Sequence, residues 1–95
     1  MTEPNTYTPR TLEEVTALEA FIRARVTPLR DADDRPYNAD EQRAVQALLD
    51  VCTVMLGGAG HRAKAGQNID TVHFYLYTAA RQWRDHPDFL PEWNR

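Results

Sequence analysis

Aromatic side chains gather in one short stretch of this sequence, and that stretch most limits how the chain can fold. Six of the nine aromatic residues lie within residues 69–93, and they are Phe74, Tyr75, Tyr77, Trp83, Phe89 and Trp93. Each ring can bury ~150–250 Å² of surface. In a chain of 95 residues these rings supply much of the apolar area, so we expect the core to form around them.

The first part of this stretch has the spacing of an amphipathic helix. Apolar or small side chains recur every three or four residues, and His73 falls on the same stripe. Asn68 is a suitable N-cap, and Pro87 disfavours helical geometry in the residue before it. The pattern predicts a helix over about residues 69–85, followed by an irregular aromatic tail.

Two further amphipathic segments precede this one. Thr11 and Glu14 fit a capping box at the start of a helix over about residues 11–27, which Pro28 would end or kink. Glu19 and Arg23, four residues apart, are expected to pair on its exposed face. A second helix is predicted over about residues 39–56, with Asn38 as its cap and with Gly57 and Gly58 ending it.

We therefore predict an all-α protein, a three-helix bundle with an irregular aromatic C-terminal tail packed back on the helices. Residues 1–10 are expected to be a flexible lead-in, residues 11–95 a single three-helix domain, and residues 57–68 a glycine- and alanine-rich loop. The single cysteine favours a reducing, cytoplasmic location. No unbroken apolar run approaches the ~20 residues that span a bilayer, so we expect no membrane contact.

Three aromatic residues of the last helix cannot all face one core, because successive helical positions differ by ~100°. Either the C-terminal tail covers the surplus rings, or they form a surface for a partner or for a second copy of the chain. The candidate partner surface comprises Phe74, Tyr75, Tyr77 and Arg81. A homodimer is expected if Tyr75 and its neighbours remain exposed.

Residues 58–63 read GAGHRA and match a G-x-G-x-x-A dinucleotide fingerprint. The fingerprint requires a preceding strand, whereas residues 45–56 have helical spacing. We therefore expect no dinucleotide cofactor. A weak anion-binding loop built from loose backbone amides and the side chains of His61, Arg62 and Lys64 remains a candidate.

Metal and catalytic patterns are poor. The acidic residues 31–34 resemble the start of an EF-hand loop, but Arg35 and Pro36 stand where a ligand and a glycine are needed. The three histidines and Cys52 lack the local spacing of zinc ligands, and the chain contains no serine. We predict no catalytic, cofactor-binding or metal-binding residues. One alternative is a small-ligand or enzyme site centred on His73.

The closing residues 84–93 read RDHPDFLPEW. This His-Pro-Asp-aromatic…Glu-Trp ending, together with the helical residues 18–25, resembles a family of short actinobacterial and actinophage proteins of unknown function. The Gly-Pro-Trp segment that those proteins often carry after the first helix is absent here. The resemblance implies an actinobacterial or phage origin and a tail with a structural role, and it implies no activity.

The formal net charge is −3, which disfavours nucleic-acid binding because phosphate contacts need a basic face. Our first hypothesis is a small non-enzymatic protein-binding or regulatory protein, phage-encoded or accessory, whose process the sequence does not name. An alternative is a helix-turn-helix-like nucleic-acid-binding protein that uses Arg81, Arg84 and the cations of residues 62–64.

Overall fold

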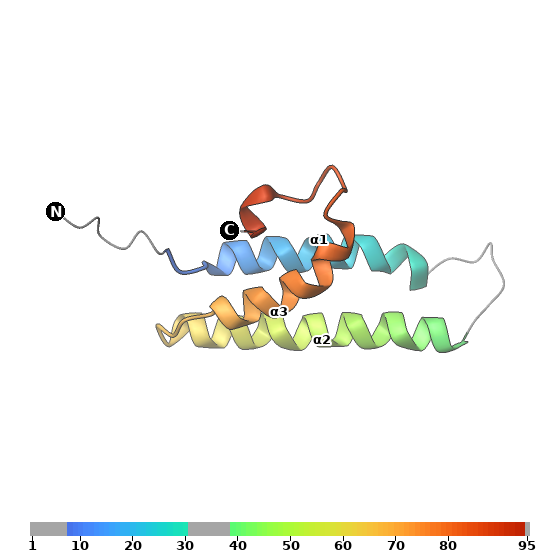
Figure 1. The fold of residues 1–95 in the computed structure, drawn as a ribbon. Coiled ribbons are helices and arrows are strands. Elements are labelled where there is room, and N and C mark those ends of the chain that lie inside the picture. The colour runs from blue at the N-terminus through green and yellow to red at the C-terminus, as the bar shows by residue number, and fades with distance from the viewer. Residues whose placement is uncertain (1–7, 31–38, 95) are drawn as a thin grey trace.

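The computed structural model describes residues 8–30 and 39–94, and within these ranges the chain forms helices and no strands. The elements are α1 (Leu12–Arg30), α2 (Ala39–Lys64), α3 (Asp70–Ala80) and two short 3-10 helices, η1 (Arg81–Trp83) and η2 (Pro91–Asn94). In Figure 1, α1 and α2 lie side by side and antiparallel, and α3 crosses from the C-terminal end of α2 towards α1. The prediction of an all-α fold with three helices is confirmed.

The start of α1 follows the predicted capping box. The backbone N–H of Thr11 donates to Oε1 of Glu14 at 3.2 Å, and the backbone N–H of Glu14 donates to Oγ1 of Thr11 at 3.2 Å. The helix continues past its predicted end to Arg30, with Pro28 inside its last turn. Proline removes one backbone hydrogen bond there, and burial of Val26 (2% exposed) holds the segment in the helix.

The predicted end of α2 at residue 56 is wrong, because the helix runs on through the glycine-rich segment to Lys64. Ala59, in the middle of that segment, is fully buried in the core, so tertiary packing outweighs the poor helix propensity of glycine. The chain leaves the helix at Gly66, two residues beyond Lys64, where the φ of 72° is easy only for glycine. Gly66 N–H donates to the Ala63 carbonyl at 3.0 Å, and Gln67 N–H donates to the Arg62 carbonyl at 2.9 Å. These two bonds form a Schellman motif.

The C-terminal tail packs back on the helices, as predicted. The α-helical part of the third helix ends at Ala80, earlier than expected, because the chain tightens into η1. The backbone N–H of Phe89 donates to the His86 carbonyl at 3.0 Å, which closes a turn with Pro87 at its second position. Beyond this turn, Trp93 is 4% exposed and its ring centroid lies 5.3 Å from that of Phe21 on α1.

The three helices contribute unequally to the core. α1 buries six residues, whereas the longer α2 buries three of the residues described, namely Leu49, Cys52 and Ala59. Among the described residues, one helix is long and apolar enough to cross a membrane, over Asp40–Lys64, with a mean hydropathy of 1.2 and 17% of its most apolar window buried. Length and composition alone are weak evidence for a span. Much of α2 therefore faces outward with apolar character.

Candidate functional site

The predicted partner surface is divided by the structure. Phe74 and Tyr75 on α3 are 62% and 53% exposed, and their ring centroids lie 6.2 Å apart. Arg81 follows in η1 and is also exposed. The side chains of Thr71 and Thr78 flank the two rings on the same exposed face. Phe74 and Tyr75 thus form an exposed aromatic pair, and we refer to them by that name below.

Tyr77 does not join the exposed aromatic pair. Its hydroxyl donates to Oδ1 of Asn94 at 2.7 Å, and its ring centroid lies 6.2 Å from that of Phe89. The side chain is half-buried beneath the tail. The tail therefore covers Tyr77 and leaves Phe74 and Tyr75 exposed. That these two rings contact a partner or a second copy stays a prediction.

The candidate anion loop is not a loop. His61, Arg62 and Lys64 lie in the last turn of α2. The unsatisfied backbone groups of that turn are carbonyls, and the helix dipole places partial negative charge there. The backbone amides that the anion site required are absent from this position, so the prediction is wrong. The three basic side chains instead complement the negative end of the helix dipole.

The histidines do not converge. His73 is 3% exposed in the core between the helices, whereas His61 is exposed at the end of α2. His86 contacts Arg25, packs its ring edge-on against Phe21 with centroids 5.7 Å apart, and accepts a 3.0 Å hydrogen bond at Nδ1 from Asp88 N–H. Residues 8–30 and 39–94 hold no group of three or more His, Cys, Asp or Glu side chains suited to a metal. The acidic residues 31–34 lie outside the described residues, as does Asn38.

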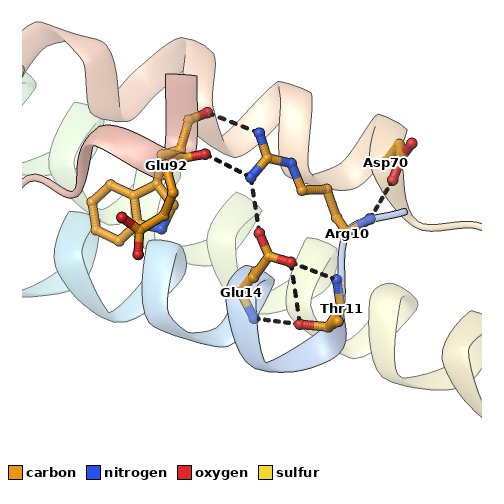
Figure 2. A network of polar contacts seen from close by, with 6 residues as sticks. Arg10, Thr11, Glu14, Asp70 and Glu92 are labelled. Atoms are coloured by element: carbon orange, nitrogen blue, oxygen red, sulfur yellow. Dashed lines mark hydrogen bonds and ion pairs between the residues drawn. The ribbon is translucent and has the colours of Figure 1, made fainter. Parts of the chain in front are cut away.

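Sequence reasoning missed a polar network around Arg10, which Figure 2 shows in close-up. The guanidinium donates to Oε2 of Glu14 at 2.8 Å and to the carbonyls of Glu92 at 2.9 Å and Trp93 at 3.2 Å. The backbone N–H of Arg10 donates to Oδ1 of Asp70 at 2.7 Å. This Arg10 network joins the starts of α1 and α3 to the tail. The expected flexible lead-in therefore does not extend to Arg10, whose side chain is 9% exposed.

A second polar contact links α1 to α2. Glu19 is 5% exposed rather than on an open face, and Arg23 donates to both of its carboxylate oxygens at 3.2 and 3.1 Å. Arg23 also donates to Oγ1 of Thr53 on α2 at 2.9 Å. The hydrogen bond to Glu19 raises the pKa of Arg23.

Burial raises the pKa of the Cys52 thiol, the charge of Glu19 adds to the rise, and Arg23 opposes it. A neutral thiol of this kind is a small hydrophobe rather than a nucleophile.

An apolar stripe runs along the side of α2 opposite its buried residues. We call it the α2 outer face, and it comprises Ala44, Ala47, Val51, Val54 and Gly58, all of them exposed. Val51 and Val54 are 53% and 74% exposed. The sequence alone did not separate Val51 and Val54 from the apolar residues on the buried side of the same helix.

No protein-family model, no curated protein and no solved structure matches this chain. The resemblance to short actinobacterial and phage proteins therefore stays a prediction. The geometry itself defines a class, that of small all-α proteins whose polar contacts hold helices together and whose most exposed large apolar side chains lie on α2 and α3.

Proposed function

We propose that this chain is a non-enzymatic protein that acts by binding another protein through α3. The observation that carries the proposal is the exposed aromatic pair, because the other aromatic side chains of the described residues are buried or half-buried. Adjacent exposed rings are typical centres of protein interfaces, where each can bury ~150–250 Å² in a partner's pocket. Arg81, about two turns further along, adds a residue type that is enriched at interfaces.

The two alternative functions have less support. A recognition helix must bring cations to the phosphates of the nucleic acid, yet α3 contains no Lys or Arg between Asp70 and Ala80. A site centred on His73 requires a ring that a ligand can reach, and that side chain is 3% exposed. Protein binding is therefore the function that we carry forward, and the cytoplasmic location and the actinobacterial or phage origin remain predictions.

The test compares the wild-type chain with a double variant, Phe74→Ala with Tyr75→Ala, on an affinity support exposed to a lysate of the source organism. A matched control, Thr71→Ala with Thr78→Ala, changes the same exposed face without touching the rings. We expect one protein to be retained by the wild-type chain and by the control and to be lost with the double variant. With that protein purified, the double variant should bind at least ~30-fold more weakly, since a single interface hot spot contributes about 2 kcal/mol.

All three chains should show the same helical circular dichroism and melting temperature, because both rings are largely exposed. Equal retention of the same proteins by the wild-type chain and by the double variant would contradict the proposal. Equal loss of binding with the threonine control would contradict the assignment of the exposed aromatic pair as the centre of the contact, because binding would then not depend on the rings in particular.

A further inference from the structure

The α2 outer face has no partner among the described residues, and its composition is that of a helix contact. Its five residues are all alanine, valine or glycine, and they lie on the side of the helix opposite Leu49 and Cys52. We infer that this face pairs with the same face of a second copy of the chain, with the two α2 helices antiparallel. The inference does not rest on the exposed aromatic pair, because α3 carries those rings and α2 carries this face.

The spacing of the α2 outer face supports a helix as its occupant. Its residues alternate in steps of three and four, from Ala44 to Ala47, to Val51, to Val54 and to Gly58. Steps of this kind average 3.5 residues and keep a stripe directed at a neighbouring helix along its whole length. A globular pocket or an extended peptide would place no such requirement on the period.

The glycines of α2 give an independent reason. A Cβ atom built at Gly58 would meet no atom of the chain within 4 Å, and the same holds at Gly57 and Gly60. Glycine weakens a helix relative to alanine, so packing within one chain gives no reason for glycine at these positions. Close approach of a second helix gives one at Gly58, which lies on the α2 outer face. It gives none at Gly57 or Gly60, which lie about 100° and 200° away around the helix.

The charges at the two ends of α2 favour a second copy of the chain as the partner, and they favour an antiparallel orientation of the two helices. The first turn carries Asp40 and Glu41, with Arg43 ion-paired to Asp40 at 3.4 Å, and the last turn carries His61, Arg62 and Lys64. An antiparallel pair places the acidic end of each helix beside the basic end of the other, whereas a parallel pair brings like charges together. Complementary ends of this kind steer association and set orientation.

A lipid bilayer is the other apolar environment that a helix like α2 could enter. Asp50 argues against it, because this exposed carboxylate lies near the middle of the helix, where a charge is most costly in a bilayer. Its carboxylate accepts a 2.9 Å hydrogen bond from Gln46 on the helix surface. In a contact with a second copy, the side chains of Asp50 and Gln46 remain at the solvent-exposed rim.

The first experiment measures the mass of the full chain by sedimentation equilibrium. We expect a dimer for the wild-type chain and at least tenfold weaker self-association for Val54→Glu, which places a charge on the α2 outer face. Ala24→Glu adds the same charge at an exposed position of α1 and should associate like the wild type. A wild-type monomer at ~100 µM, or equal association of Val54→Glu and wild type, would overturn the inference. A third outcome would overturn the inference in favour of a membrane. In that case the wild-type chain is monomeric and binds phosphatidylcholine/phosphatidylglycerol vesicles, and Val54→Glu does not bind them.

The second experiment uses substitutions that strengthen the helix. Gly58→Ala should weaken self-association several-fold although it raises the thermal stability of the single chain, and Gly57→Ala should raise stability and leave self-association unchanged. Equal association of the two alanine variants would count against close helix contact.

Charge reversal then tests the direction of the pair. Asp40→Lys with Glu41→Lys, or Arg62→Glu with Lys64→Glu, should each weaken self-association, and mixing the two chains should restore it. No weakening in either chain would overturn the antiparallel arrangement. The double variant of Phe74 and Tyr75 should dimerise normally, so that failure of the dimer and failure of the α3 partner surface can be told apart.

Discussion

Replacing Arg10 by alanine should destabilise the fold far more than an ordinary surface substitution. The guanidinium makes hydrogen bonds of 2.8 and 2.9 Å to the Glu14 carboxylate and the Glu92 carbonyl, and one of 3.2 Å to the Trp93 carbonyl. Hydrogen bonds that involve a charged group contribute ~1.5–3 kcal/mol each. Three such bonds set an upper bound of ~4.5–9 kcal/mol, and the true loss must be smaller because such contributions are not additive.

Solvent lowers the expected value further. Glu92 is exposed, so water can replace the guanidinium at its carbonyl, whereas Trp93 is 4% exposed. We therefore expect Arg10→Ala to lower the free energy of unfolding by about 2–4 kcal/mol. Arg10→Lys should lose an intermediate amount, because an ammonium keeps the attraction to Glu14 but lacks the planar fork that reaches two carbonyls at once.

Urea denaturation, followed by helical circular dichroism and by the fluorescence of Trp83 and Trp93, measures these changes at one low protein concentration. A loss below about 0.5 kcal/mol in Arg10→Ala, the range of ordinary surface substitutions, would refute the reasoning. So would equal stability of Arg10→Lys and the wild-type chain, since the prediction depends on the fork geometry as well as on charge.

Three further outcomes follow from the packing. Trp93→Ala should cost about 3–5 kcal/mol of unfolding free energy in the same urea titration, because a buried ring is removed from the core. Cys52 should resist Ellman's reagent until the chain unfolds. The raised pKa of its thiol also fixes the direction in which stability changes with pH. Stability should fall as pH rises above ~8.5, because the unfolded thiol ionises first, and Cys52→Ala should lack that decline. Gly57→Ala should raise the free energy of unfolding by about 1 kcal/mol in a thermal melt, since its Cβ meets open space within a helix.

Local patterns predicted the elements of this fold where the relevant energies are local. The capping box of Thr11 and Glu14 was correct because it depends on a few neighbouring residues. Gly57 and Gly58 were misread as a helix end because burial of Ala59 outweighs glycine propensity. The true end at Gly66 could have been found, since basic residues in a last turn followed by glycine are a known terminator pattern.

Contacts between distant parts of the chain could not be predicted in this way. The partners of Arg10 lie 60, 82 and 83 residues away in the sequence, and no local period reports them. The burial of Glu19 was missed for the same reason, because its Arg23 partner is local but the helix that covers it is not. For the candidate partner surface, the sequence predicted only that the last helix carries more aromatic side chains than one core can cover. Whether the tail reached Phe74, Tyr75 or Tyr77 depended on its path in three dimensions.

The Arg10 network has a consequence for how the chain is made. Its guanidinium can reach its carbonyl partners only after residues 92 and 93 have left the ribosome. Until then the Phe21 ring on α1 lacks the indole that later covers it. α1 is therefore synthesised well before the residues that cover it, and the Arg10 network can form only once residues 10 to 93 have all left the ribosome.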